Sequence, residues 1–330
     1  MKNYPESAVL ILFFTRKEPL EQVFEAVRKR KPKKLYLFQD GPRENRADDV
    51  EKIQICRQVV ENIDWECEVH RHYCESNMGC DPAEYAAVSW ALETEDRIIR
   101  LEDDNVPSQS FFDFCDEMLE RYKDDKRIFM VCGRNQLGKT NYNEDSYFFS
   151  TVDSIWGFAT WKDRWDMLDH THSFLEDEYL LNAIKNKSTN KYETDLFINK
   201  CRVHREDSLK NNKVSSYESA VYAALLLNNM LSIVPRVNMI RSAGMSADSV
   251  HTPASEEYVL KKDRWLYNTE AYELEFPLIH PKHVINNVKF YDERNKLLHI
   301  SSKGERNRHK LKLAMNKRWV NFKKLFRKKK

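Results

Sequence analysis

Three consecutive acidic residues, Glu102, Asp103 and Asp104, follow a short apolar-rich run that begins at Arg97. Such a run is typical of a buried strand in a parallel sheet, and ligands of these sheets bind in the crevice at the carboxyl ends of the strands. Three neighbouring carboxylates repel one another, so a divalent cation or a cationic partner would offset their charge. Because all the donors are oxygen atoms, the expected ion is Mg²⁺ or Mn²⁺. The alternative is a solvated acidic turn, in a chain of which 32% is charged.

Alternating strands and helices are expected to position these acids. The apolar runs 8–14 and 35–38, the segment 66–71 and the run that ends at Leu101 are the predicted strands. Helical spacing of apolar residues, or a turn that leads into a helix, separates them. This alternation predicts an α/β fold with a doubly wound, mostly parallel sheet, right-handed crossovers and helices on both faces.

Four residues are predicted at the rim formed by the strand ends: Thr15, Asp40, Arg71 and Asp104. No glycine-rich G-x-G-x-x-G or G-x-x-x-x-G-K-[ST] loop follows the first strand, so neither a dinucleotide site nor a P-loop is expected. Any bound phosphates would therefore be held by a metal ion and side chains.

The second half of the chain contains further candidates for chemistry. Trp156 and Trp161 belong to a cluster of three tryptophans, which fits core packing or an aromatic cleft for sugar rings. Glu218 begins an apolar helix, whose positive end would stabilise a carboxylate in any case. His251 lies in a polar loop, where a lone histidine is usually just solvated.

Together, over about residues 8–290, these segments resemble in order and spacing glycosyltransferases of the GT-A fold. They resemble in particular bacterial sugar transferases distantly related to N-acetylglucosaminyltransferase I. The segment 101–104 resembles the family's D-x-D-type metal motif. The segment 40–42 (Asp-Gly-Pro) resembles the strand end that holds the nucleotide base, and the segment 155–161 resembles the family's tryptophan-rich segment. Two departures stand out: Glu218 replaces the usual aspartate, and residues 244–246 read Gly-Met-Ser instead of Gly-Phe-Gly.

The resemblance implies a metal-dependent hexosyl- or N-acetylhexosaminyltransferase of surface polysaccharide or glycoconjugate synthesis. The sugar would move from a nucleotide-diphosphate donor, by preference a UDP-sugar, to a hydroxyl of a glycan or lipid-linked acceptor, with inversion. Glu218 would be the catalytic base. The implied metal ligands are Asp104 and His251. The implied contacts with the nucleotide-sugar are Thr15, Asp40, Arg71, Glu102 and Asp103. Trp156 and Trp161 would line the cleft for the sugar or acceptor.

Two other functions stay open. A nucleotide-sugar-binding protein without turnover would fit the departures at Glu218 and at residues 244–246. A sugar nucleotidyltransferase would share the fold and the metal, but it would normally carry a glycine-rich, arginine-containing loop directly after the first strand, and residues 14–18 lack one.

Charge divides the chain at about residue 302. Residues 303–330 contain thirteen Lys or Arg and one Glu, a formal charge of +12, whereas the remainder carries −10. In this tail the apolar residues recur at steps of four, four, three and four, which places them on one face of a basic helix. These residues are Leu311, Met315, Trp319, Phe322 and Phe326. The pattern predicts attachment to an anionic membrane surface. The alternatives are a disordered solubilising tail and nucleic-acid binding, and the acidic body argues against nucleic acid.

We therefore expect a catalytic domain over residues 1–302, with a nucleotide-binding half (1–132) and an acceptor half (133–302), followed by the tail 303–330. No stretch approaches eighteen apolar residues, and the early run 8–14 is too short for a signal peptide. Seven cysteines without a C-x-x-C pair indicate reduced thiols. The expected location is cytoplasmic, at the inner face of the membrane.

Overall fold

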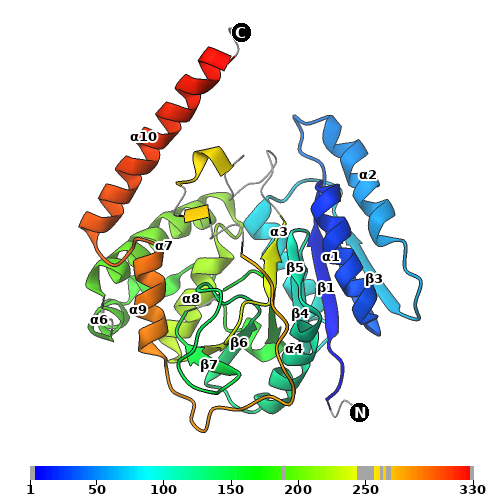
Figure 1. Ribbon diagram of the computed structural model, residues 1–330, viewed down its shortest axis with the longest axis horizontal. Helices are drawn as coiled ribbons and strands as arrows, with labels where there is room; N and C mark the ends of the chain where they lie inside the picture. Colours follow the sequence, from blue (N-terminus) through cyan, green and yellow to red (C-terminus); the bar gives the residue numbers. More distant parts are fainter. Residues whose placement is uncertain are drawn as a thin grey trace.

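The computed structural model describes residues 4–152, 154–187, 190–243, 256–260, 263–264 and 269–327, and an eight-stranded sheet forms its centre (Figure 1). The strands are β1 (Ala8–Phe13), β2 (Lys34–Gln39), β3 (Glu68–Tyr73), β4 (Arg97–Glu102), β6 (Ile128–Cys132), β7 (Tyr147–Ser150), β8 (Phe158–Trp161) and β9 (Leu231–Pro235). Their spatial order is β3-β2-β1-β4-β8-β6-β9-β7. Six of the eight run in one direction, and β8 and β7 are antiparallel to their neighbours. The predicted mostly parallel sheet is confirmed, and the two predicted halves of the chain share it.

Helices cover both faces of this sheet, as the alternation predicted. One face packs against α1 (Lys17–Arg30), α2 (Asp48–Val60) and α4 (Gln109–Arg121), and the other against α3 (Cys80–Ala91) and α8 (Tyr217–Leu227). All six residues of β1 are buried, and its alternate side chains enter the two apolar cores on opposite sides. A strand covered on both faces must be apolar throughout, which explains the uninterrupted run from Ala8 to Phe13.

A second, two-stranded sheet continues the chain just after the acidic residues. It pairs β5 (Asn105–Pro107) with β10 (Ile240–Ser242) in antiparallel register. Gly157 makes this close packing possible: its φ is +64°, and a Cβ there would lie 2.5 Å from Ile240 Cδ1. The Gly133 N–H donates to the Gly157 carbonyl at 2.7 Å, so the backbones meet directly beneath Ile240.

The remaining elements surround the end of the sheet that contains β9 and β7. The short α5 (Lys162–Trp165) follows β8, and η1 (Ser173–Glu176), α6 (Glu178–Lys187) and α7 (Lys191–Asn211) enclose a smaller apolar core around Phe174 and Cys201. The chain then passes through η2 (Glu256–Tyr258) and α9 (Val288–Leu297). Phe290 of α9 is buried beside β7 and β9.

The basic tail forms α10 (Lys303–Arg327), which projects beside the body in Figure 1. The predicted amphipathic helix is confirmed, and its apolar row faces outward: Leu311, Met315, Trp319 and Phe322 are each at least half exposed. Contacts with η2 hold the helix, since the Asn316 amide donates to the Glu257 carbonyl at 3.0 Å and the Tyr258 hydroxyl donates to Asn321 at 3.1 Å. In the described part of the chain, no helix combines the length and apolar character that crossing a membrane requires.

Candidate functional site

The direction of winding changes between β1 and β4. The chain winds outward from β1 through β2 to β3, and then returns to place β4 on the other side of β1. Leu12 pairs with Glu102, so the residues that follow both strands emerge side by side at the same edge. In doubly wound sheets, this switch point is where ligands bind. The acidic residues therefore lie where the fold itself predicts a binding crevice.

Arg16, in the turn after β1, binds two of the three acids. Its Nη1 lies 2.9 Å from Asp104 Oδ2, and its Nη2 donates to Asp103 Oδ1. The side chain of Asp103 is only 5% exposed and that of Asp104 13% exposed. Asn105 donates to the other oxygen of Asp104 at 2.7 Å. The strand-end acids thus form a preorganised, largely desolvated group with an arginine counter-ion.

A second arginine, Arg100 of β4, forms an ion pair with the third acid, Glu102. Its guanidinium is 1% exposed and lies 2.5 Å from Glu84 of α3 and 2.7 Å from Glu102. It also donates to the carbonyl of Ile155 at 2.8 Å. Because a buried charge is tolerated only when it is paired, the arginine and both glutamates stabilise one another on the α3 face of the sheet.

The two arginines do not neutralise the cluster. Among the residues that the structure describes, the ion-pair partners of Glu84, Glu102, Asp103 and Asp104 are Arg16 and Arg100, which gives these six groups a formal charge of −2 when all are ionised. Burial raises the pKa of all four carboxyls, although the arginines oppose this shift. The pKa of Glu102 is raised to about 7. The charge distribution therefore favours a divalent cation at this edge.

Oxygen donors for such an ion are present. Each carboxylate oxygen of Asp104 accepts one hydrogen bond and retains a further lone pair. Among the residues that the structure describes, the buried Asn105 Oδ1 has no hydrogen-bond partner. A hard-ligand set with excess negative charge fits Mg²⁺ or Mn²⁺ better than a softer ion. The predicted assignment of Asp104 to a metal is consistent with this chemistry.

Glu218 follows Tyr217, a residue that interacts with the acidic cluster. Tyr217 is buried against Glu84, Arg100 and Glu102. Burial, together with the negative charge of the two glutamates, raises the pKa of its hydroxyl. Glu218 follows at the first turn of α8, with its side chain 45% exposed and 3.8 Å from Lys200. The Glu218 carboxylate is thus partly exposed to solvent and has Lys200 as a charged neighbour.

The two predicted cleft tryptophans lie at opposite ends of the central strand β8, Trp156 just before it and Trp161 as its last residue. Trp156 is near the acids, because Arg100 bonds the preceding carbonyl, and the Arg134 guanidinium stacks 3.8 Å from its ring centroid. Trp161 pairs with Arg97 at the start of β4, is 4% exposed and donates to the Leu119 carbonyl. The assignment of Trp161 to a sugar or acceptor cleft is wrong: it is a core residue.

The predicted nucleotide contacts have different surroundings. Thr15 lies at the switch point, directly before Arg16. The Asp40 carboxylate accepts from the backbone N–H groups of Gly41, Met78 and Gly79 and from the Asn77 amide, so it holds the loop after β3.

Arg71 lies differently from the expectation that placed it at the rim. β3 continues to Tyr73, and the Arg71 guanidinium is bonded to Glu61 at 2.7 Å and 2.8 Å. The rim placement of Arg71 is therefore wrong, because the strand is two residues longer than its pattern indicated. The predicted roles of His251 and of residues 244–246 lie outside the described residues.

Three residues of the cluster were not predicted from the sequence: Arg16, Arg100 and Glu84. The sequence contains a signal for two of them, Arg100 and Glu84. Arg100 interrupts an apolar strand, and Glu84 lies on the apolar face of α3 between Ala83 and Ala87, so each buried charge requires an opposite partner. Arg16 gave no comparable signal, since its contacts depend on the pairing of β1 with β4.

No family model matches the chain, and no curated protein matches its sequence. Some solved structures overlap it in part. HddC from Yersinia pseudotuberculosis, complexed with GMP-PN, is 14% identical with a TM-score of 0.30, covering 48% of this chain and 77% of that one. UDP-glucose pyrophosphorylase, complexed with UDP-glucose, is 8% identical with a TM-score of 0.32, and the match covers 71% of this chain and 91% of that one. The glycosyltransferase GlyE from Streptococcus pneumoniae TIGR4 is 11% identical with a TM-score of 0.25, and the match covers 76% of this chain and 57% of that one. Overlaps this weak do not bear on function.

Proposed function

We propose that the chain is a metal-dependent glycosyltransferase of the GT-A type, a distant relative of N-acetylglucosaminyltransferase I. It transfers a hexosyl or N-acetylhexosaminyl unit from a nucleotide-diphosphate sugar, by preference a UDP-sugar, to a hydroxyl of a glycan or lipid-linked acceptor. One observation carries the proposal: a desolvated acidic cluster with a formal charge of −2 lies at the switch point of a doubly wound sheet.

The chain's own residues have distinct parts in this proposal. Asp104 holds the ion, with Asn105 and Arg16 fixing the orientation of its carboxylate. Bound Mg²⁺ or Mn²⁺ would neutralise the charge that develops on the diphosphate leaving group. Glu102 and Asp103, next to the ligand, keep the site negative and supply acceptors for ribose hydroxyls.

Glu218 is the proposed catalytic base. An inverting displacement requires a group that accepts the proton of the acceptor hydroxyl, and a carboxylate within hydrogen-bond reach suffices. The position of Glu218 beside Tyr217, on the same side of the sheet as Glu84 and Glu102, supports this role. Trp156, stacked with Arg134 near the acids, is the proposed aromatic surface for the sugar.

Ligand-dependent stabilisation tests the proposal directly. Melting temperatures would be measured for the full chain with UDP-, GDP- and ADP-sugars, each with and without Mn²⁺. We expect stabilisation by one donor class only when Mn²⁺ is present, by about 2.7 kcal/mol at a hundred times the dissociation constant. No stabilisation by any donor with Mn²⁺ would refute a nucleotide-sugar site.

Turnover separates the proposal from its two alternatives. A glycosyltransferase hydrolyses its donor slowly in the absence of acceptor and releases free sugar, whereas a binding protein without turnover leaves the donor intact. A nucleotidyltransferase would instead release pyrophosphate from a nucleoside triphosphate and a sugar 1-phosphate. Sugar release without pyrophosphate release is the result we expect.

We further propose that α10 attaches the enzyme to an anionic membrane surface on the cytoplasmic side, where lipid-linked acceptors are elongated during surface polysaccharide synthesis. The exposed row of Leu311, Met315, Trp319 and Phe322 supports this, because it lies on a helix otherwise rich in Lys and Arg. Such a helix lies in the lipid interface with its apolar side chains buried. Each basic residue near an anionic leaflet contributes about 1 kcal/mol.

A further inference from the structure

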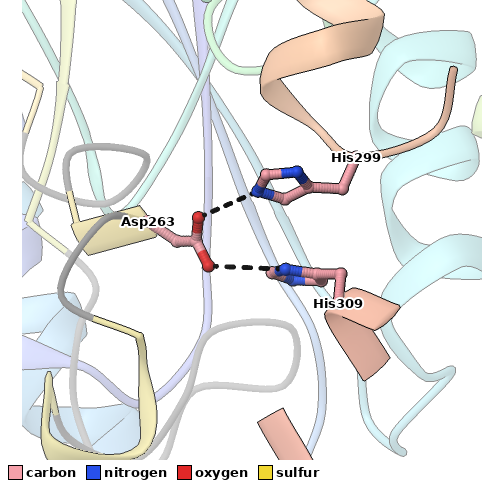
Figure 2. Close-up of side chains that lie close together, drawn as sticks. All are labelled: Asp263, His299 and His309. Atoms are coloured by element: carbon pink, nitrogen blue, oxygen red, sulfur yellow. Dashed lines mark hydrogen bonds and ion pairs between the residues drawn. The ribbon is translucent and has the colours of Figure 1, made fainter. Parts of the chain in front are cut away.

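A cluster of two histidines and an aspartate lies at the N-terminal end of α10 and shares no residue with the acidic site. Figure 2 shows the carboxylate of Asp263 facing both His299 and His309, with one oxygen directed to each ring. His299 Nε2 lies 3.2 Å from Asp263 Oδ1, and His309 Nδ1 lies 3.7 Å from Asp263 Oδ2. One ligand atom from each of the three residues falls within 4.8 Å of the others. No role in the proposed sugar transfer involves these residues.

We propose that Asp263, His299 and His309 bind a Zn²⁺ ion. Bonds of about 2.0–2.1 Å from a tetrahedral zinc to nitrogen and oxygen set neighbouring ligand atoms about 3.3 Å apart. The two imidazole nitrogens lie 3.2 Å and 3.7 Å from different oxygens of the Asp263 carboxylate, so a rotation that brings one oxygen near both nitrogens would give this geometry. Two imidazoles and one carboxylate favour zinc over the hard ions expected at Asp104, and a water molecule completes four ligands.

The surroundings of the cluster favour a metal ligand role for His299. Its Nδ1 lies 3.2 Å from Glu305 Oε1. A carboxylate that accepts from one imidazole nitrogen leaves the other with its lone pair available, and this arrangement is the common support of zinc-bound histidines. Asp263 is buried, with its side chain 7% exposed, while the two histidines are 18% and 19% exposed. The site is thus shielded but reachable by an ion.

The three ligands come from separate parts of the chain, which gives the ion a structural effect. Asp263 follows η2, His299 ends the turn after α9, and His309 lies in the second turn of α10. A zinc ion that joins them would clamp α10 to the body, in addition to the contacts of Asn316 and Tyr258.

Metal binding by the full chain tests the site. The Asp104→Ala variant is the parent, so that the proposed catalytic metal does not contribute and a failure of either proposal stays distinguishable. After incubation with Zn²⁺ and gel filtration, we expect one zinc per chain, reduced to near zero in His299→Ala and in His309→Ala. The matched control is His283→Ala, an exposed histidine that should leave the stoichiometry unchanged.

Two further measurements test which atoms bind the metal and whether the metal holds α10 to the body. Co²⁺ in place of zinc should give the visible absorption of a four-coordinate nitrogen and oxygen site, without charge-transfer bands from thiolates. Hydrogen exchange of the first three turns of α10 should slow at least tenfold with zinc and return to its original rate with a chelator. Glu305→Gln should weaken zinc binding about 10- to 100-fold.

Several outcomes would overturn the proposal. These are no bound zinc, equal zinc content in the parent and in His309→Ala, thiolate bands in the cobalt spectrum, and no effect of zinc on exchange in α10. If His309→Ala lost the helix altogether by circular dichroism, His309→Gln would replace it, since glutamine keeps a polar side chain of similar length without an imidazole ligand.

Discussion

The guanidinium of Arg16 lies 2.9 Å from the carboxylate of Asp104, the residue to which we assign the catalytic metal. The same guanidinium also bonds Asp103. Arg16 therefore stabilises the acidic cluster in the absence of an ion, and a bound divalent cation would compete with it for the same negative charge.

Replacing Arg16 by glutamine should separate these two effects. We expect Arg16→Gln to lose about 2 kcal/mol of stability without metal, because two partly buried carboxylates lose their counter-ion. We also expect Mn²⁺ to stabilise this variant more than it stabilises the unaltered chain. Chemical denaturation with and without Mn²⁺ measures both. Arg46→Gln, at an exposed pair with Asp48, is the control and should change neither.

Asp104→Asn should remove most of the metal-dependent reaction. The amide has the same shape but no charge, so we expect sugar release to fall about 10²- to 10³-fold, the loss typical of one electrostatic contributor. The melting temperature without metal should fall little or rise, since repulsion within the cluster decreases. Asp124→Asn, an exposed acid after α4, serves as the control. Turnover of Asp104→Asn within threefold of normal would remove Asp104 from the site.

Glu218→Gln should affect the chemical step much more than donor binding. A group that accepts a proton only in the transition state contributes to kcat, so we expect kcat to fall at least 100-fold while the dissociation constant for the donor stays within threefold. Lys200→Met removes the nearby cation and keeps the carboxylate, and it should change kcat far less. Normal turnover by Glu218→Gln would show that another residue takes the proton.

A buried histidine outside the site should make folding sensitive to acid. Burial lowers the pKa of His172 to about 4, although Asp169 opposes the shift, and its Nε2 lies 2.9 Å from the Ser219 hydroxyl. The unfolded chain takes up this proton near pH 6.5. The stability contribution is therefore complete above pH 6.5 and lost as the pH falls toward 4, by about 3 kcal/mol.

The check is urea unfolding of the unaltered chain and of His172→Gln at pH 7 and pH 4.5. The loss of stability between these values should be smaller in the variant, because glutamine has no proton to gain. His283→Gln should retain the full loss. An equal loss in all three proteins would mean that other groups dominate the acid response.

Vesicle sedimentation tests the proposed membrane attachment of α10. The full chain should sediment with vesicles that contain anionic lipid, and a chain ending at Ser302 should stay in the supernatant. Replacing Trp319 and Phe322 together by serine should weaken binding at least tenfold, because both side chains are at least half exposed and would lose apolar area buried in lipid. Recovery of the full and shortened chains in equal amounts would contradict the proposal.

The sequence predicted the core of the fold because its signals are local. A strand covered on both faces needs an apolar run, and β1 and β2 have one. By contrast, β8 lies antiparallel between β4 and β6, and nothing in the residues 158–161 reveals which distant strands they join. Pairing between distant segments is a property of the whole sheet.

The same distinction explains which parts of the site were predictable. Asp104 was predicted from three adjacent acids at the end of an apolar run. Trp161 was misassigned because a tryptophan in a cleft and one in a core have the same local pattern, and only the register with Arg97 places it at the end of the strands opposite the acids. Arg16 was missed because its contact with Asp103 arises from the alignment of β1 with β4.

The two edges of the central sheet also affect how the protein behaves at high concentration. Along the β3 edge, Glu68, His70, Arg71 and His72 place polar and charged side chains beside the open backbone groups. At the β7 edge, the Asn287 N–H donates to the Phe149 carbonyl, and the Asn286 side chain accepts from Thr151. A charged edge and a covered edge both disfavour the addition of a strand from another molecule. The sheet is thereby protected from edge-to-edge aggregation, and self-association would have to use helical surfaces.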